Sequence, residues 1–517
     1  MQQQVKHANP DVALPSAFFI FTIKETTMTT PLSDIQIHLA HPHQLYIDGR
    51  WVDAAHGGRV EVVSPNTEQV IATVAEATEA DMDSAVAAAR AAFDHGPWPR
   101  LSPLERAEYL RKLSAALEPR LPELAKAWVD QVGALASVAP FVTGAGKFWF
   151  DYYANLATSY SFEEPRKPFD GLGSALVVRE AVGVVAAIAP WNNPFGIMTG
   201  KIAPALLAGC TVVMKPAPET PIEAYIIAEA AEQAGFPAGV INLCTSHREA
   251  ADHLVRHPGI DKVSFTGSVV AGRRIASVCG NRLARYTLEL GGKSAAIVLD
   301  DADIAAAAKT LASTIAMSAG QVCATLSRAI VSKRRHNALV EAIQAEMEAL
   351  RVGDPYDAAA QMGPLAMARQ RARVEDYIAI GQSEGAQLVN GGHRPAHLPT
   401  GFYLAPTLFT GVTSTMRIAQ EEIFGPVLAV LSFDTEEEAV RIANDSPFGL
   451  YGAVFTPDRE RAYRVARGMR TGTVSQNVFR FDPSLPFGGF KQSGVGREGG
   501  TDGLAAYTEL KSVLLTA

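Results

Sequence analysis

Short apolar runs rich in β-branched residues alternate with helical patterns from Gly183 onward, and this alternation restricts the chain to very few folds. Strand, helix and strand in regular order predict a parallel sheet, because parallel neighbours need a long crossover that is usually a helix. We therefore predict a doubly wound, Rossmann-like α/β domain that binds ligands beyond the carboxyl ends of its strands. Its five strands are predicted at 183–190, 211–215, 239–244, 262–267 and 284–292.

A second α/β series follows residue 292, so we predict two Rossmann-like domains. An Ala-rich helix is expected over 303–318. Residues 45–160 should add a short strand pair and long amphipathic helices to the first domain, and 162–185 should form a protruding hairpin. The strands of the second series are predicted at 294–299, 328–332, 426–433, 452–455 and 472–476.

The helix after strand 211–215 carries both start and stop signals. Thr220 can cap its N-terminus, Pro221 suits the first helical position, and Glu223 completes a capping box. Gly235 is expected to end the helix, since glycine readily adopts the left-handed conformation found at that position.

Composition excludes several classes of protein. The chain is 48% apolar and 19% charged with a net charge of −8, which is typical of an ordinary globular protein. It has no basic block of the kind that binds nucleic acid, and no apolar run long enough to span a membrane. We interpret residues 1–27 as a disordered tail or an over-called start, because Met28 opens a segment that looks like a natural beginning.

The potential metal and disulfide ligands are too scattered to form a site. The four cysteines are widely spaced and include no CxxC pair, so reduced thiols and a cytoplasmic location are expected. His38, His41 and His43 cluster without cysteine or acidic partners at metal-binding spacing. We predict no metal site.

Cys323 ends the run GQVC (320–323), where Gly320 allows the backbone a close approach. Backbone N–H groups after such a turn would favour the thiolate, which is the nucleophilic form of cysteine. A buried structural cysteine is the alternative that this run alone leaves open. A catalytic thiol would also need an oxyanion stabiliser and a group that breaks the covalent adduct.

Two residues at the carboxyl ends of predicted strands can supply these functions. Glu289 ends the fifth strand before two glycines, and burial would raise its pKa toward neutrality, as a general base requires. Asn192 follows the first strand in PWNNPF (190–195), where two prolines fix an amide that can donate to an oxyanion. Taken alone, Glu289 also fits a surface ion pair, and Asn192 fits a turn.

The run FTGSVVAG (265–272) follows the fourth predicted strand and opens a helix. Gly267, Ser268 and Gly272 could receive a phosphate there, because a helix N-terminus offers unpaired N–H groups and a favourable dipole. The run is not GxGxxG, so it gains weight only from the two-domain α/β context.

Seven motifs occur in order and with suitable spacing. Each is modest alone, but together they are specific, and the chain resembles the aldehyde dehydrogenase superfamily from about Leu45 to its C-terminus. The motifs are PWNNP, VMKPAPETP (213–221), FTGSVVAG, LELGGKS (288–294), GQVC, EEIFGPV (421–427) and PFGGFKQSGVGRE (486–498).

This resemblance implies NAD(P)-dependent oxidation of an aldehyde to a carboxylic acid. Cys323 would attack the carbonyl to form a thiohemiacetal, whose oxyanion is held by Asn192 and the Cys323 backbone N–H. Hydride transfer to the nicotinamide would leave a thioester, and Glu289 would activate the water that hydrolyses it. The alternatives are a coenzyme A-acylating enzyme, whose members typically lack the base carboxylate, and a catalytically silent binding or structural homologue.

The resemblance also implies cofactor contacts. Lys215 is expected at the adenosine ribose, Ser268 with Gly267 at the pyrophosphate, and Glu422 at the nicotinamide ribose. The full set of cofactor-binding residues implied is Trp191, Lys215, Gly267, Ser268, Glu422 and Phe424.

The residues expected at the adenosine end bear on the choice between NAD and NADP. Pro218 stands where relatives that prefer NAD often carry a carboxylate, and Glu219 comes one place later. A missing acid removes a repulsion against a 2′-phosphate. NAD is expected, and NADP stays possible.

The resemblance places the aldehyde pocket between two walls. Asn193 and Gly200 occupy positions that are often bulky in relatives, and three phenylalanines lie in the loop that should line the tunnel. A roomy apolar tunnel would suit medium to large apolar or aromatic aldehydes. The phenylalanines are Phe479, Phe481 and Phe487.

Domain boundaries follow from the same resemblance. We expect an N-terminal tail over 1–36, a dinucleotide-binding domain formed by 37–161 and 183–289, and a catalytic domain over 290–491. The segments 162–182 and 505–517 resemble elements that pair between subunits, which implies a homodimer or homotetramer.

Overall fold

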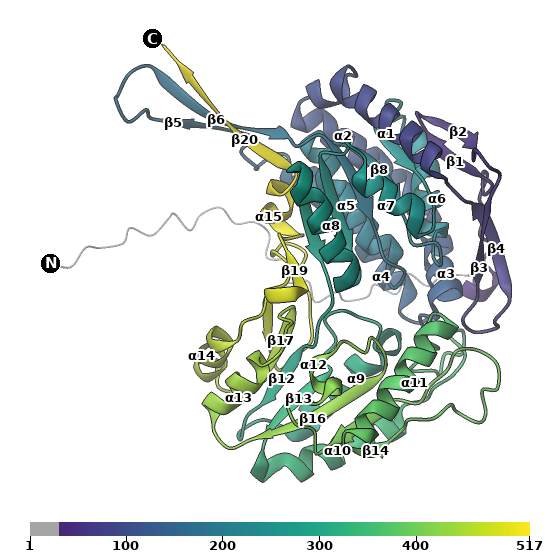
Figure 1. The fold of residues 1–517 in the computed structure, drawn as a ribbon, viewed down its shortest axis with the longest axis vertical. Coiled ribbons are helices and arrows are strands. Elements are labelled where there is room, and N and C mark those ends of the chain that lie inside the picture. The colour runs from purple at the N-terminus through teal and green to yellow at the C-terminus, as the bar shows by residue number, and fades with distance from the viewer. Residues whose placement is uncertain (1–29, 517) are drawn as a thin grey trace.

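A computed structural model describes residues 30–516, and two large sheets organise it (Figure 1). The first sheet has the strand order β19-β11-β10-β7-β8-β9-β1-β2, and β11 to β9 run parallel. The order reverses between β7 and β10, which creates a crevice at the carboxyl ends of these strands. The strands are β1 (Gln44–Ile47), β2 (Arg50–Asp53), β7 (Val184–Ile188), β8 (Thr211–Lys215), β9 (Ile241–Leu243), β10 (Lys262–Thr266), β11 (Arg285–Glu289) and β19 (Gly494–Val495).

The five predicted strands of this sheet are confirmed, and burial on both faces explains their continuous apolar sequences. Val184 and Ala186 of β7 enter one core, whereas Val185 and Ala187 enter another on the opposite face. Helices α1 (Glu79–Asp94), α7 (Arg248–Arg256) and α8 (Val269–Arg282) cover the first core. The opposite core is covered by α2 (Pro103–Leu117), α3 (Leu121–Val132), α4 (Ala139–Leu156), α5 (Pro194–Ala208) and α6 (Ile222–Gln233).

The second sheet has the order β14-β15-β16-β13-β12-β17-β18, with only β14 antiparallel to its neighbour. Its strands are β12 (Ala295–Val298), β13 (Arg328–Ser332), β14 (Gln387–Asn390), β15 (Thr407–Thr410), β16 (Val427–Phe433), β17 (Tyr451–Phe455) and β18 (Thr473–Gln476). Its main helices are α9 (Ile304–Ala316) and α10 (His336–Ala349) on one face, and α11 (Ala368–Ser383), α13 (Glu436–Asn444) and α14 (Arg459–Gly468) on the other. The prediction included five of these strands but missed β14 and β15.

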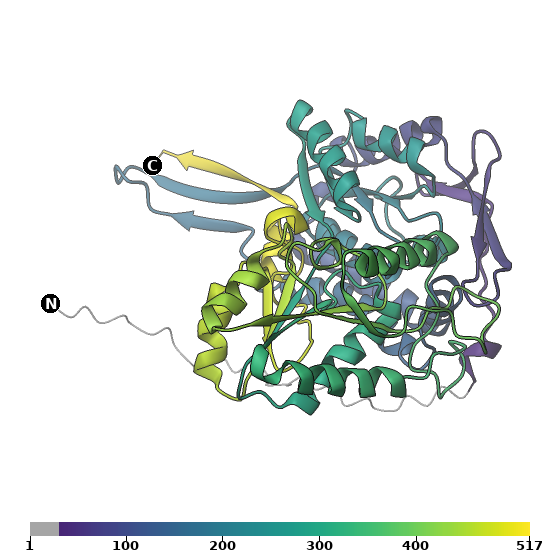
Figure 2. The same cartoon turned by 60° about the horizontal axis from the view of Figure 1, so that its bottom comes forward.

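A third sheet projects from the body of the molecule (Figures 1 and 2). The predicted hairpin forms β5 (Glu163–Arg166) and β6 (Ser174–Ala181), and the C-terminal strand β20 (Thr508–Leu515) pairs antiparallel with β6 along its whole length. The chain therefore places its last strand beside a segment more than 300 positions earlier.

The N-terminal region is more ordered than expected. Leu32 is buried against α3, so the part of the expected 1–36 tail that the structure describes is packed on the body. The interpretation of residues 1–27 lies outside the described residues. Besides the predicted strand pair, which is β1 with β2, a second pair forms a separate two-stranded sheet: β3 (Arg59–Val63) with β4 (Val70–Ala75).

The capping box predicted for α6 is wrong. The helix begins at Ile222 after Pro221, and no side chain of residues 30–516 caps it. Glu223 is buried, and its carboxylate accepts a hydrogen bond from Gln131 Nε2 at 2.7 Å, because tertiary packing offers it a partner in the interior. The predicted end is confirmed, since Gly235 has φ +72° directly after the helix.

No described helix is long and apolar enough to cross a membrane. The described side chains include no group of three or more His, Cys, Asp and Glu that could hold a metal ion. His41 instead stacks on Trp51, with ring centroids 4.8 Å apart.

Candidate active site

The three predicted catalytic residues come together where the two sheets meet. Asn192 follows β7, Glu289 ends β11, and Cys323 lies in the turn before β13. The Asn192 amide Nδ2 donates to the Gln321 carbonyl at 2.9 Å, two residues before the cysteine. The charge of Glu289 is close enough to raise the pKa of the Cys323 thiol. Residues from both α/β units thus form a single site.

The loop that carries Cys323 is held in an uncommon backbone conformation. Ser318, Ala319 and Gly320 all have positive φ, at 46°, 51° and 73°. The Gln321 side chain is fully buried, donates to the Ser318 carbonyl at 2.8 Å and accepts from the Ala366 N–H at 3.0 Å. Gln321 is thus hydrogen-bonded to Asn192, to Ser318 in its own loop and to Ala366. These bonds hold the strained loop in one conformation and so fix the position of Cys323.

The two glycines after Glu289 allow three motifs to interlock. A Cβ on Gly292 would lie 2.3 Å from the Cys323 carbonyl oxygen, and a Cβ on Gly291 would lie 2.1 Å from Glu422 Oε2. The Gly292 N–H donates to Glu422 Oε1 at 3.0 Å. These contacts explain why the motifs LELGGKS, GQVC and EEIFGPV occur together. The backbone of the first motif lies directly against residues of the other two.

The Cys323 thiol differs from the sequence expectation. All four cysteines are within the described range, and Cys323 alone is not fully buried. Desolvation in the pocket and the charges of Glu422 and Glu289 raise the pKa of its thiol to about 12, although the N–H groups of Ala324 and Cys323 act in the opposite direction. The expectation that backbone N–H groups favour the thiolate is confirmed in direction, but burial and two carboxylates outweigh them, so the pKa of the thiol is raised.

Glu289 has the environment of a general base. It is 3% exposed, and neither carboxylate oxygen has a hydrogen-bond partner among residues 30–516. Burial, followed by the charge of Glu498, raises the pKa of Glu289 well above its usual value, while Lys201 and Arg497 lower it. The predicted rise in pKa is therefore confirmed in direction.

Three of the residues implied for cofactor binding, Lys215, Gly267 and Ser268, lie at the carboxyl ends of strands in the first sheet. Lys215 is buried at the end of β8, and burial lowers its pKa to about 8. Ser268 caps α8, its Oγ accepting from the Ala271 N–H at 3.3 Å, and this helix begins just after the carboxyl end of β10. The Gly267 N–H already donates to the Glu289 carbonyl at 3.0 Å.

The opposite side of the crevice is formed by the second α/β unit. Burial raises the pKa of Glu422 to about 7. The rings of Trp191 and Phe424 meet edge to face with centroids 5.3 Å apart, which joins the two units. A buried lysine, a helix N-terminus and a half-buried carboxylate are groups of the kind that hold the riboses and pyrophosphate of a dinucleotide.

Comparison with known proteins decides the family. The aldehyde dehydrogenase family model matches residues 51–513, which is most of the chain. The chain belongs to the aldehyde dehydrogenase family. It is 44% identical to the geranial dehydrogenase of Castellaniella defragrans over 92% of this chain and 99% of that protein.

Solved aldehyde dehydrogenase structures share the fold. The Mycobacterium tuberculosis enzyme complexed with NAD+ matches with a TM-score of 0.88 and 44% identity, covering 92% of this chain and 98% of that one. A mutant of aldehyde dehydrogenase C from Pseudomonas syringae, complexed with NAD+ and octanal, matches with a TM-score of 0.89 and 38% identity, covering 93% and 98%. The predicted two-domain fold and family are confirmed.

The predicted substrate residues of this aldehyde dehydrogenase occupy two places. Phe481 lies between Phe479 and Phe487, with centroids 5.1 and 5.6 Å apart, and Tyr451 joins the cluster at 4.9 Å from Phe479. Cys323, Phe479 and Phe487 pack against the same hydrophobic core. The three phenylalanines thus form one aromatic wall.

The surroundings of Gly200 differ from the expectation of small residues alone. A Cβ on Gly200 would lie 3.5 Å from the indole nitrogen of Trp149, so this ring, which the sequence prediction missed, stands over the glycine. Asn193 caps α5, its Oδ1 accepting from the Gly196 N–H at 3.3 Å. Nothing in the sequence around Trp149 distinguishes it from other helical aromatics.

Two charged residues near Glu289 were also missed. Lys201 on α5 is fully buried, and its Nζ lies 2.5 Å from Glu498 Oε1. The two charges act on Glu289 in opposite directions. A lysine inside the otherwise apolar run of α5 was the available sequence signal, because a buried lysine needs a partner.

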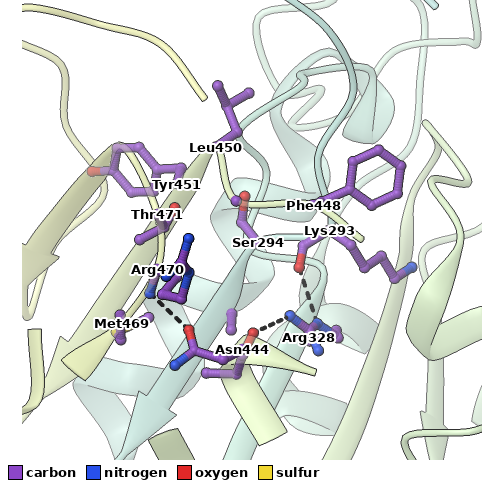
Figure 3. Close-up of a pocket in the computed structure, with 13 residues that line it drawn as sticks. Lys293, Ser294, Arg328, Asn444, Phe448, Leu450, Tyr451, Met469, Arg470 and Thr471 are labelled. Carbon is purple, nitrogen blue, oxygen red and sulfur yellow. Dashed lines mark hydrogen bonds between the residues drawn. The ribbon is translucent and has the colours of Figure 1, made fainter. Parts of the chain in front are cut away.

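Lys293 lies between two small cavities. Its Nζ has no hydrogen-bond partner among the described residues, and burial with the charge of Arg328 lowers its pKa to about 7. One cavity also includes Cys323 and Glu422; the other has room for about one water, at about 10 Å³ (Figure 3). Arg328 lines the cavity shown in Figure 3 and donates to the carbonyls of Lys293, Ile442 and Ala443. These bonds hold the wall of that cavity in place, so we interpret it as structural.

Proposed function

We propose that this chain oxidises an aldehyde to the carboxylic acid and reduces NAD+. The observation that supports this most is the pairing of a nucleophilic residue, Cys323, with a buried, unpartnered carboxylate, Glu289, in one crevice. A coenzyme A-acylating enzyme or a silent homologue would have no need of that carboxylate.

The side chains perform the reaction in two halves. The Cys323 sulfur attacks the carbonyl carbon, and its thiol proton leaves to a base. The Asn192 amide and the Cys323 N–H then stabilise the oxyanion of the thiohemiacetal. When bound, NAD+ supplies the hydride acceptor, and Cys323 is left as a thioester.

The second half releases the acid. Glu289 takes a proton from water, and the water oxygen attacks the thioester carbon. The carbon–sulfur bond breaks, the departing Cys323 sulfur receives the proton that Glu289 had taken from water, and the carboxylic acid leaves. Asn192 again faces the oxyanion of this step.

For the cofactor, Lys215 and Glu422 would hold the two riboses and the α8 N-terminus with Ser268 would hold the pyrophosphate. Trp191 and Phe424 would flank it. The solved relatives that contain NAD+ support NAD over NADP.

For the substrate, we propose medium to large apolar or aromatic aldehydes. The aromatic wall formed by Phe479, Phe481 and Phe487 suits such a ligand. Geranial dehydrogenase among the relatives, and octanal in a related structure, support the same class. A homodimer or homotetramer and a cytoplasmic location stay predictions.

The test uses Cys323→Ser and Glu289→Gln. Cys323→Ser should form no acid, whereas Glu289→Gln should lose about 10²–10⁴-fold in kcat, because hydrolysis loses its base. Intact mass spectrometry with decanal and NAD+ should show acyl mass on Cys323 accumulating only in Glu289→Gln. Full turnover by Cys323→Ser would refute the proposal, and Glu249→Gln, an exposed change on α7, serves as the control.

A further inference from the structure

Tyr451 is a buried tyrosine whose hydroxyl is bonded to the backbone of the aromatic wall. It is 2% exposed and is the first residue of β17. Its hydroxyl donates to the Arg480 carbonyl at 2.8 Å and accepts from the Arg480 N–H at 3.0 Å. Tyr451 also lines the small cavity of Figure 3, where its hydroxyl points away from Lys293 and Arg328. The hydroxyl is therefore directed at the segment that contains Arg480.

The Tyr451 ring packs against the two phenylalanines that flank Arg480. Its centroid lies 4.9 Å from that of Phe479 and 5.5 Å from that of Phe481, and both pairs are tilted. Aromatic rings attract one another at such distances and angles. One side chain thus holds the backbone between the two phenylalanines and also contacts both rings.

The aromatic wall leads from the catalytic crevice to the surface. Phe487 directly precedes Gly488, where a Cβ would lie 2.7 Å from Glu289 Oε1. The ring centroids of Phe487 and Phe481 are 5.6 Å apart, and Phe481 is 49% exposed. The row of rings therefore starts beside the proposed general base and ends at solvent, as a path for an apolar chain would.

The backbone next to Tyr451 lies against the turn after β11. Leu450 directly precedes Tyr451, and its Cβ lies 3.4 Å from the position that a Cβ on Gly292 would take. The same position on Gly292 is 2.3 Å from the Cys323 carbonyl oxygen. The start of β17 thus connects the surroundings of the nucleophile to the aromatic wall, and Tyr451 is the side chain that makes the connection.

We infer that Tyr451 is a positioning residue for the substrate: it holds Phe479 and Phe481 beside the crevice, and so favours aldehydes with long apolar or aromatic chains over short ones. The inference rests on the proposed aldehyde oxidation and deepens it. The phenylalanines contact the chain of the substrate, whereas Tyr451 acts through them. A short aldehyde does not reach the wall, so the effect of Tyr451 should depend on chain length.

Tyr451→Phe tests this, because it keeps the ring and removes only the hydroxyl that holds Arg480. In steady-state kinetics, kcat/KM for decanal should fall about tenfold, chiefly through KM, while that for acetaldehyde changes less than about twofold. Tyr403→Phe is the matched control, since Tyr403 is also 2% exposed and its hydroxyl donates to Asn66 in the loop between β3 and β4. It should leave the ratio of the two kcat/KM values unchanged.

A double-mutant cycle with Phe481→Ala tests whether Tyr451 acts through the wall. In the Phe481→Ala background, Tyr451→Phe should lower kcat/KM for decanal by only about threefold or less, because a ring that it positions is already absent. Trypsin gives a readout without turnover. Arg480 is exposed, so loss of the hydroxyl that holds its backbone should speed cleavage after it, which mass spectrometry identifies.

The outcomes separate this inference from the proposed function. Equal losses for decanal and acetaldehyde in Tyr451→Phe, or an undiminished effect in the Phe481→Ala background, overturn the inference and leave the proposed function standing. An unchanged rate of cleavage after Arg480 also overturns it, because the hydroxyl would then not hold the segment. A wild-type chain that oxidises no aldehyde of any chain length overturns the proposed function, and the inference with it.

Discussion

At the residue scale, Cys323 and Glu289 share a buried environment that disfavours their charged forms. Desolvation raises the pKa of both, and each carboxylate near the thiol opposes a thiolate. A protonated thiol reacts slowly with stray electrophiles, so Cys323 should be unreactive until a base removes its proton. The effects of the Glu422 and Glu289 charges on the pKa of the Cys323 thiol can be measured separately.

Glu422→Gln should lower the pKa of the Cys323 thiol by about one pH unit, because Glu422 is the larger of the two charges that raise it. The pH dependence of iodoacetamide alkylation at Cys323, followed by mass spectrometry without cofactor, measures this. Glu421→Gln is the matched control, since that exposed carboxylate pairs with Arg417. An unchanged midpoint would show that burial alone sets the thiol pKa.

Glu223 should make stability depend on pH. Burial raises its pKa to about 8, so the folded state holds a proton that the unfolded chain releases at lower pH. This contribution is complete below the unfolded pKa and is lost as pH rises through about 8. The unfolding temperature should therefore fall more between about pH 5.5 and 8.5 in wild type than in Glu223→Gln, by about 1–2 °C in a thermal melt.

A Glu249→Gln variant provides the comparison, because Glu249 is an exposed carboxylate on α7. It should follow the wild-type pH dependence. If Glu223→Gln also follows it, then the buried carboxyl group does not titrate in this range.

At the element scale, the turn after β11 is the tightest junction in the site. Gly291 and Gly292 let Glu422 and Cys323 approach the backbone closer than any side chain would permit. By contrast, Gly280 in α8 has space around it: a Cβ there would meet no atom of the described chain within 4 Å. The two kinds of glycine should respond differently to the same substitution.

Gly292→Ala should reduce kcat by about 10²-fold, because its Cβ would push the Cys323 carbonyl and displace the nucleophile. Gly280→Ala should leave kcat unchanged and raise stability by about 0.5–1 kcal/mol, since alanine is the better helix former. Steady-state kinetics and denaturant unfolding of both variants give the comparison. Equal kinetics in the two variants would show that the turn tolerates a shift.

Most of the buried elements could be predicted from sequence, and the reasons for the misses are specific. Strands β7, β8 and β10 are buried on both faces and therefore read as apolar runs, whereas β14 is a partly exposed edge strand with a weaker signal. The capping box predicted for α6 is wrong because the Glu223 carboxylate is hydrogen-bonded to Gln131 in the interior and does not bond back to the helix N-terminus.

The site shows the same division. Cys323, Glu289 and Asn192 stand in motifs that can be recognised in the sequence. Trp149 meets Gly200 through a contact between distant segments, which no local pattern encodes. The effect of two carboxylates on the thiol likewise depends on tertiary placement.

At the scale of the whole molecule, the projecting sheet presents an apolar face. Leu510 and Leu514 lie on the same side of β20 and are 68% and 74% exposed, and Phe169 and Leu172 are exposed near the tip of the hairpin. An apolar face of this kind on a projecting sheet is typical of a subunit contact.

Leu510→Lys/Leu514→Lys should therefore reduce the mass of the assembly in light scattering, because two charges would be buried at the contact. Leu104→Lys, which changes a 56% exposed leucine on α2, should leave the mass unchanged. An oligomer of unaltered mass in the double variant would place the contact elsewhere.

The first sheet closes only with residues from the end of the chain. Its strand β11 stops at Glu289, the chain then builds the entire second sheet, and Val495 returns to pair with Leu288. During synthesis on the ribosome, the strand that bears Glu289 must therefore wait with an unpaired edge until nearly the whole polypeptide has emerged. Premature termination late in translation would leave a nearly full-length product with that edge open to aggregation.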